Sequence, residues 1–298
     1  MTGLRGTWFV VPTPFTEDGA VDLPSLRRVV EAAIGWGVDG LTVMGVTSEA
    51  DELTPSEREG ALEATAAAVG GRVPVVVGCS DRDPRVVIER ATRAASMGGA
   101  AAMVAALPGS FAGELPALYE RIRSESGIPI LVQDEPAATG VRMPGEVLLA
   151  CLDAAGSRTV KLEDPPTAPK IAHLLEARSD LEVFGGLGGA AALSELRRGA
   201  CGTMTGFAFP EVLAAVRVHT ESGDHGRAAQ VFDRHLPLIL LEAQLGLGVR
   251  KELLRRRGAV ETAVTRRPAH LDAGTLADLD DILRRVGITP GPDRMEVR

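Results

Sequence analysis

The feature that most constrains the fold of this 298-residue chain is a regular alternation of short β-rich runs with amphipathic helical segments. Strands that are joined by crossover helices run parallel, and these runs are too apolar to have a face in water. Each of the eight runs is followed by a segment with helical periodicity. The runs lie at 8–12, 40–45, 73–78, 101–106, 129–133, 158–162, 181–185 and 202–205.

The segments between the runs begin with recognisable helix-start signals. Before the segment at 56–69, Thr54 is a suitable cap, Pro55 suits the first helical position and Glu57 completes a capping box. Asp22 is available as the cap of the segment at 23–35. The other predicted helices lie at 84–97, 114–124, 144–155, 169–176 and 190–198.

Eight strand–helix units are the number found in an α/β (β/α)8 barrel, or TIM barrel. An open doubly wound sheet is the alternative, but no glycine-rich dinucleotide loop follows the first run. A barrel needs one helix after its eighth strand, whereas the helical pattern here continues to about residue 286. We therefore predict a barrel over 1–210 and, over 211–298, the last barrel helix plus additional C-terminal helices, all in one structural unit.

Charge and cysteine content exclude several classes of function. A formal net charge of −8 argues against binding to nucleic acid or to an anionic membrane surface. No apolar stretch approaches the roughly 20 residues that span a bilayer, and no signal-peptide pattern is visible. The three cysteines are scattered and the five histidines form no ligand pairs, which predicts neither a metal nor another cofactor. We expect a cytoplasmic protein.

Active sites of such barrels gather at the C-terminal ends of the strands, and the sixth run ends with Lys161. The chain has only three lysines against 29 arginines, so this position is a candidate for a function that needs an amine. A desolvated lysine can lose its proton and attack a carbonyl carbon, which arginine cannot do. The other two lysines, Lys170 and Lys251, fall in helical patterns and are expected on the helix surface.

The second run ends in a turn of sequence Gly-Val-Thr-Ser-Glu at 45–49. A glycine followed by small hydroxyl residues exposes successive backbone N–H groups, which suits a carboxylate. We expect Val46, Thr47 and Ser48 to bind the substrate there. An amine that faces such a turn forms a Schiff-base site for 2-oxo acids, because the turn holds the carboxylate while the amine condenses with the ketone.

These motifs, in this order, resemble the dihydrodipicolinate synthase/N-acetylneuraminate lyase superfamily of class I aldolases and dehydratases. The resemblance covers nearly the whole chain and rests on the stretches 11–15, 45–49, 53–54, 57–58, 160–161, 185–186, 202–204 and 249–254. It implies that Lys161 forms the Schiff base and that Gly186 and Met204 contact the substrate. It also implies a pyruvate-like 2-oxo acid as ligand and a homotetramer as the assembly.

The chain departs from the family pattern at the end of the fifth run. Family members carry a proton-relaying tyrosine there, in a Tyr-Asn-x-Pro-x-x-x-Gly pattern, whereas the matching stretch at 133–140 begins with Gln133. The first hydroxyl of the carboxylate turn is replaced by Val46, and the arginine of the synthase is replaced by Ala138. We therefore expect a divergent member that is not dihydrodipicolinate synthase itself. Thr47, the substrate carboxylate, Asp134 and Glu135 are the remaining candidates for proton transfer.

Two functions remain open from the sequence. The first is a lyase that cleaves, condenses or dehydrates a 2-oxo acid through a Schiff base on Lys161, with Thr47 and Gln133 as further catalytic residues. The alternative is a catalytically silent relative that binds a carbonyl acid as a sensor or interaction protein. Loss of the tyrosine favours the second function, and retention of Lys161 favours the first.

Overall fold

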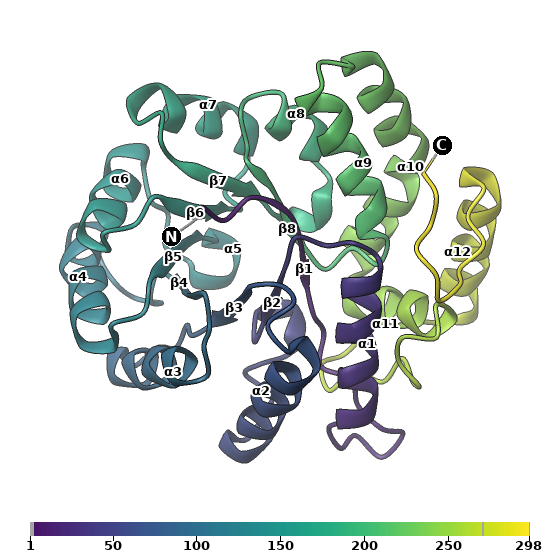
Figure 1. Cartoon of the computed structure of the whole chain (residues 1–298), viewed down its shortest axis with the longest axis horizontal. Helices are drawn as coiled ribbons and strands as arrows, with labels where there is room; N and C mark the ends of the chain where they lie inside the picture. Colours follow the sequence, from purple (N-terminus) through teal and green to yellow (C-terminus); the bar gives the residue numbers. More distant parts are fainter. Residues whose placement is uncertain (1–2, 270, 298) are drawn as a thin grey trace.

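The computed structural model describes residues 3–269 and 271–297, in which eight parallel strands close into a barrel (Figure 1). The strands pair in sequence order, and β8 pairs with β1 to close the ring. The predicted TIM barrel with C-terminal helices is confirmed. The strands are β1 (Gly6–Val10), β2 (Gly40–Val43), β3 (Val75–Gly78), β4 (Ala101–Ala105), β5 (Ile130–Asp134), β6 (Thr159–Leu162), β7 (Glu182–Gly185) and β8 (Gly202–Thr205).

Most strands differ from the predicted runs by one or two residues at an end, and at three of these ends a proline accounts for the difference. Strand β1 ends before Pro12, β3 begins after Pro74 and β5 begins after Pro129. Proline has no backbone N–H to donate to a neighbouring strand, so ladder pairing stops beside it. The apolar run therefore overestimates the paired strand at these points.

The helices surround the barrel and follow the strands in alternation (Figure 1). The predicted capping box of α2 is present, because the Thr54 hydroxyl accepts from the Glu57 N–H and the Glu57 carboxylate accepts from the Thr54 N–H. The predicted helix at 190–198 is shorter than expected. The helices are α1 (Leu23–Gly35), α2 (Pro55–Val69), α3 (Pro84–Ser96), α4 (Leu115–Ser126), α5 (Pro136–Thr139), α6 (Gly145–Ala154), α7 (Thr167–Ala177), α8 (Ala192–Leu196), α9 (Pro210–Glu221), α10 (His225–Leu245), α11 (Leu247–Arg256) and α12 (Ala273–Val286), with 3-10 turns η1 (Val46–Ser48), η2 (Ala112–Glu114) and η3 (Leu187–Gly189).

Strand side chains alternate between two apolar clusters, one outside the strands and one inside the barrel. Val160 and Leu162 of β6 belong to the outer cluster, under the helices. Lys161 lies between them in the strand and therefore points into the barrel. The inner cluster consists of Trp8, Val10, Val76, Ala101, Met103, Leu131, Phe184, Cys201 and Met204.

The C-terminal helices pack beside the barrel helices, with α10 against α9 and α12 against α10 (Figure 1). The Arg-rich stretch at 250–257 is less exposed than its sequence suggests. Arg257 is 1% exposed, and its guanidinium lies 3.7 Å from the centre of the Trp36 ring and binds the carboxylate of Glu211. This ion pair joins the extension to the barrel. The division into 1–210 and 211–298 stays a prediction.

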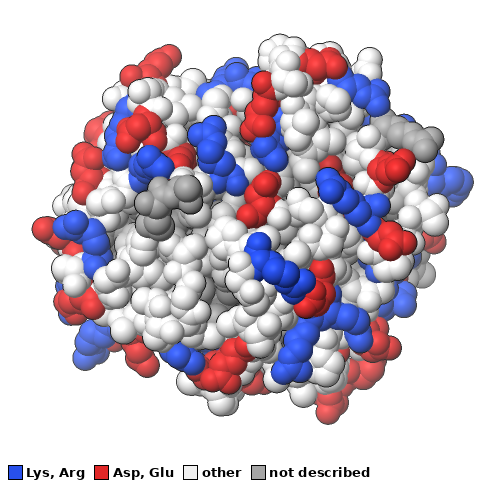
Figure 2. All heavy atoms as spheres, viewed as in Figure 1, with Lys and Arg blue, Asp and Glu red and all other residues white. Residues whose placement is uncertain are grey.

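Acidic and basic side chains are interspersed on the face of the molecule shown in Figure 2. Among the described residues, none of the helices combines the length and the apolar composition needed to cross a membrane. Within the same residues, histidine, cysteine and acidic side chains do not cluster in threes as they would around a metal ion.

Candidate active site

Lys161 and Gln133 lie side by side inside the barrel because their strands, β6 and β5, are neighbours. The register of β5 and β6 pairs Gln133 with Lys161 directly. Lys161 is only 6% exposed, and its Nζ lies 2.9 Å from Oε2 of Glu163. The amine that the sequence singles out is therefore enclosed in the barrel and ion-paired to a carboxylate one residue beyond the strand.

The amide of Gln133 connects two carboxylates. Its Nε2 donates to Oε2 of Glu163 at 2.8 Å and to Oε2 of Glu135 at 2.7 Å. Only the amide nitrogen carries hydrogens, so two carboxylate acceptors determine the orientation of this side chain. The result is a continuous polar chain that runs from Lys161 through Glu163 and Gln133 to Glu135.

Glu163 is a site residue that the sequence interpretation missed. Its Oε1 accepts a hydrogen bond from the Leu187 N–H at 3.2 Å. Gly186 leaves room for the carboxylate, because a Cβ at this glycine would lie 2.3 Å from that oxygen. Glu163 is two residues after Lys161, so the strand alternation places both side chains on the same side. This spacing is the signal that could have revealed it.

Glu135 has an unusual protonation equilibrium. Burial and the neighbouring carboxylate of Glu163 raise its pKa to about 7, although the ammonium of Lys161 acts in the opposite direction. A carboxyl group with this pKa exists in both forms near neutral pH and can exchange protons in either direction. Glu135 can therefore transfer protons near neutral pH, whereas Gln133 cannot, because its amide does not titrate in this range.

A cavity of about 620 Å³ opens over the C-terminal ends of β2 to β5 and reaches the polar chain at Gln133 and Glu135. Its volume lies within the range of about 300–1,000 Å³ that is usual for small-molecule sites. The strand-two turn contributes Gly45 and Val46 to its wall, and Val46 is 44% exposed. Its charged lining residues are Asp51, Arg58, Asp81, Arg82, Arg90, Glu135 and Arg267.

The segment at 45–49 contains the 3-10 turn η1, and the three residues predicted to bind the substrate differ in their hydrogen bonds. The Oγ1 of Thr47 is buried and has no hydrogen-bond partner among the described residues. The first N–H groups of such a turn have no internal partner, which leaves the amides of Val46 and Thr47 for an anion. Ser48, in contrast, is 1% exposed and donates its hydroxyl to the Val11 carbonyl at 2.6 Å. Its hydroxyl connects the turn to the end of β1 and is not directed to a ligand, which corrects the prediction for Ser48.

The other two predicted substrate contacts, Met204 and Gly186, stay predictions. Met204 is fully buried in the apolar cluster inside the barrel, beside aromatic side chains such as Phe184. Like Lys161, it does not line the cavity described above. Gly186 lies against the carboxylate of Glu163, which can approach closely because glycine has no side chain.

The chain's one tyrosine, Tyr119, is buried in α4 and donates its hydroxyl to the Val104 carbonyl at 3.0 Å.

Lys170 and Lys251 are not the ordinary surface lysines that their helical patterns suggested. Lys170 in α7 binds the carboxylates of Asp134 and Asp164 at 2.5 and 3.1 Å. Asp134 thus faces the helices, on the opposite side of β5 from Gln133, where it is a salt-bridge partner of Lys170 and not a group that could transfer protons at Lys161. Lys251 in α11 is 1% exposed and binds Oε2 of Glu49 at 2.7 Å.

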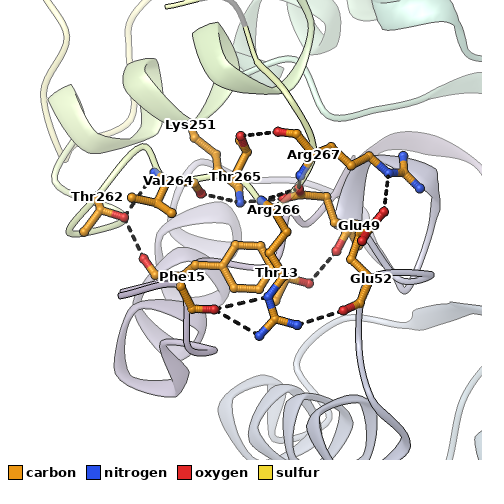
Figure 3. A network of polar contacts seen from close by, with 12 residues as sticks. Thr13, Phe15, Glu49, Glu52, Lys251, Thr262, Val264, Thr265, Arg266 and Arg267 are labelled. Atoms are coloured by element: carbon orange, nitrogen blue, oxygen red, sulfur yellow. Dashed lines mark hydrogen bonds and ion pairs between the residues drawn. The ribbon is translucent and has the colours of Figure 1, made fainter. Parts of the chain in front are cut away.

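Glu49 anchors the end of the carboxylate turn to the C-terminal extension (Figure 3). It has a left-handed backbone with φ of 52°, which is strained for a residue other than glycine. Its Oε1 accepts from the N–H groups of Arg266 and Arg267, both at 2.8 Å. The guanidinium of Arg267 also donates to the Val46 carbonyl at 3.3 Å. The extension therefore holds the turn in place from outside the barrel.

Replacement of Lys251 by methionine tests this anchor. We expect the free energy of unfolding to fall by about 3–5 kcal/mol, because the variant leaves the Glu49 carboxylate buried without its counter-ion. Burial lowers the pKa of Lys251 to about 8, which reflects the cost of charging it at this position. The measurement is urea denaturation of both proteins at neutral pH.

A double variant with Glu49→Gln as well as Lys251→Met provides the control. It removes both charges and is expected to recover part of the lost stability. A Lys251→Met protein as stable as the parent would contradict the anchoring role.

Comparison with known proteins identifies the family. The model of the dihydrodipicolinate synthetase family matches residues 4–283. The chain belongs to this family. The predicted superfamily membership is thereby confirmed, and with it the general class of Schiff-base aldolases and dehydratases.

Individual relatives of the dihydrodipicolinate synthetase family align along nearly the whole chain. An L-2-keto-3-deoxyarabonate dehydratase of Azospirillum brasilense is 33% identical, with 95% of this chain and 94% of the relative covered. A 4-hydroxy-tetrahydrodipicolinate synthase of Acidobacterium capsulatum is 27% identical, with 98% and 99% covered. The crystal structure of a dihydrodipicolinate synthase from Rhodopseudomonas palustris superposes with a TM-score of 0.90 at 30% identity, with 95% and 97% covered.

Proposed function

We propose that the protein is a lyase that dehydrates a 2-oxo acid through a Schiff base on Lys161. The observation that carries the proposal is the enclosed Lys161 amine, 2.9 Å from the Glu163 carboxylate and linked through Gln133 to Glu135. Amides of Val46 and Thr47, with the unpartnered Thr47 hydroxyl, supply donors for the substrate carboxylate. Family membership supports the lysine chemistry.

The proposed reaction begins when Glu163 takes a proton from the Lys161 ammonium and the neutral amine adds to the ketone carbon. Glu163 returns this proton to the departing hydroxyl, so that loss of water leaves a protonated imine and a free Glu163 carboxylate. The positive nitrogen of the imine acidifies the protons on the neighbouring C3 carbon. A carboxylate then takes one C3 proton, and the electron pair forms the enamine. When the C4–O bond breaks, that pair forms the C3–C4 double bond, and the leaving hydroxide takes a proton to become water. Hydrolysis of the imine releases the unsaturated product and restores the amine.

Two carboxyl groups suit the two proton transfers. Glu163 lies beside the amine in an ion pair and is placed to act as the base at C3. Glu135 has a pKa raised to about 7 by burial and by Glu163, so it holds a proton part of the time at neutral pH and is suited to act as the acid at the C4 oxygen. Gln133 positions both groups. Together they replace the tyrosine relay that the resemblance would require.

Dehydration is favoured over aldol cleavage by the full-length relative that is an L-2-keto-3-deoxyarabonate dehydratase. The silent binding protein remains the second candidate because the family resemblance places Gln133 where other members are expected to carry the relay tyrosine. Turnover separates the two candidates, since a silent relative would bind a carbonyl acid, even as an imine, without dehydrating it.

The homotetramer stays a prediction, which light scattering would check.

Trapping with borohydride tests the proposal. The protein is incubated with pyruvate or with longer 2-oxo acids, reduced, and then examined by intact mass and peptide mapping. We expect one adduct, on Lys161. Lys170 and Lys251 serve as internal controls because they lie on helices α7 and α11, where they bind Asp164 and Glu49, and not inside the barrel. Absence of an adduct with every acid, from folded protein, would refute the Schiff-base lyase.

The pH dependence of turnover tests the role of Glu135. If its carboxyl group must be protonated to donate to the leaving oxygen, kcat falls as the pH rises through about 7, the pKa to which burial and Glu163 raise this group. Glu135→Gln removes this limb of the profile and lowers kcat by about 10²-fold or more. A wild-type profile that rises through the same range would instead assign Glu135 as a base.

A further inference from the structure

We propose that the part of the cavity beyond β3 is a subsite for a second acid group, so that the substrate is a 2-oxo acid with an anionic far end. The inference rests on the proposed function, which places the ketone at Lys161. The catalytic chain lies on β5 and β6, whereas the arginines Arg58, Arg82 and Arg90 border the cavity from α2, the strand-three loop and α3. The two regions are separated by β4, so one elongated ligand can contact both.

Arg58 is the principal residue of this subsite. Its Nη1 and Nη2 donate to the carbonyl oxygens of Gly78 and Ala50 at 3.3 and 3.2 Å, and no carboxylate lies within ion-pair distance of it among the described residues. Burial, together with the charge of Arg90, lowers the pKa of Arg58 to about 10. A half-buried guanidinium that is bonded only to neutral carbonyls, with the carboxylates of Asp81 and Asp51 beyond ion-pair distance, is only partly compensated, and an anion in the cavity would stabilise it.

Arg82 adds a second uncompensated charge. It lies on the exposed loop after β3, lines the cavity, and makes no hydrogen bond or ion pair with the described residues. Arg90 is held in place, because it donates to the Ser80 carbonyl at 2.6 Å and pairs with Asp81 at 2.9 Å. The cluster thus combines one fixed, neutralised arginine with two arginines that have no acidic partner.

The charge balance of the cavity wall points to an anion and not to a neutral sugar chain. Asp81 pairs with Arg90 and Asp51 pairs with Arg267, and Glu135 lies at the other end, bonded to Gln133. Arg58 and Arg82 therefore remain without an acidic partner at this end of the cavity, and the wall as a whole carries one net positive charge when Glu135 is ionised. A carboxylate or a phosphate at the far end of the ligand satisfies them equally well in chemical terms.

The test compares acids of equal length that differ only at the far end. Half-saturation of borohydride trapping is measured with 2-oxoglutarate, with 2-oxopentanoate and with 4-phosphono-2-oxobutyrate. We expect the wild type to bind at least one of the two dianions about tenfold more tightly than 2-oxopentanoate, and the better dianion identifies carboxylate or phosphate as the natural group. Equal or weaker binding of both dianions would overturn the subsite.

Matched arginine variants locate the effect. Arg82→Gln is expected to reduce the preference for the dianion several-fold, and Arg58→Gln to abolish it, while 2-oxopentanoate is trapped as in the wild type. Arg85→Gln is the control, because this arginine is 82% exposed in its side chain, pairs with Asp83 and does not line the cavity. Arg58 also holds two backbone carbonyls, so Arg82→Gln keeps the test valid if Arg58→Gln does not fold. A preference unchanged in Arg82→Gln and in any folded Arg58→Gln would also overturn the proposal.

Calorimetry separates failure of the subsite from failure of the proposed function. Glutarate and pentanoate have no ketone and cannot form an imine, so their binding does not depend on Lys161 chemistry. Tighter binding of glutarate, lost in Arg82→Gln, supports the subsite even if no acid is ever trapped. Equal binding of the two acids, with trapping intact, refutes the subsite alone.

Discussion

Replacement of Lys161 by arginine is expected to abolish imine trapping and to lower kcat by at least about 10³-fold, since removal of a nucleophile leaves only the residual effect of binding and positioning. Arginine keeps the positive charge and can still pair with Glu163, which lies 2.9 Å from the lysine amine. The variant therefore separates the need for a nucleophile from the need for a cation. The measurements are intact mass after reduction and the rate of loss of the 2-oxo acid.

Lys170→Arg is the matched control for this experiment. Lys170 is on α7 and binds Asp134 and Asp164 on the outer side of the strands, so the same substitution there changes no group inside the barrel. We expect its trapping and turnover to stay within a few-fold of the wild type. An adduct on the Lys161→Arg protein would show that another amine performs the chemistry.

Replacement of Glu163 by glutamine is expected to lower kcat by about 10²–10⁴-fold while an adduct on Lys161 still forms. Glutamine keeps the size of the side chain and an acceptor for the Leu187 N–H, but it cannot take a proton from C3. The base at C3 is needed only after the imine has formed, so the variant should still be trapped by borohydride although its turnover is slow. Exchange of the C3 hydrogen with deuterium, followed by NMR, reports the missing step directly.

Asp164→Asn is the control for Glu163→Gln. Asp164 is the next residue along the chain, but it binds Arg142 and Lys170 on the outer side of the barrel. We expect this variant to keep most of the turnover and the exchange. If Glu163→Gln exchanged the C3 hydrogen at the wild-type rate, Glu163 would not be the base.

The sequence determined the barrel and its approximate site for a simple reason. Repeated strand–helix units have one closed arrangement in which every apolar strand is covered, and that arrangement brings all strand ends together. Lys161 follows from the same logic, because the strand alternation that buries Val160 and Leu162 under helices turns the residue between them inward. The two-residue alternation of side chains in strands and the apolar periodicity of about four residues in helices are sufficient for these conclusions.

The partners of the polar residues were decided only by the tertiary structure. Glu163 becomes a site residue because Gly186, directly after β7, leaves space for it and Gln133 from β5 donates to it, and neither contact is local in the sequence. Lys251 is 202 residues from Glu49, and a helical pattern cannot show that the two meet in the core. Ion pairs of this kind depend on charge, distance and burial across elements. Sequence periodicity records which face of an element is apolar, but not what that face meets.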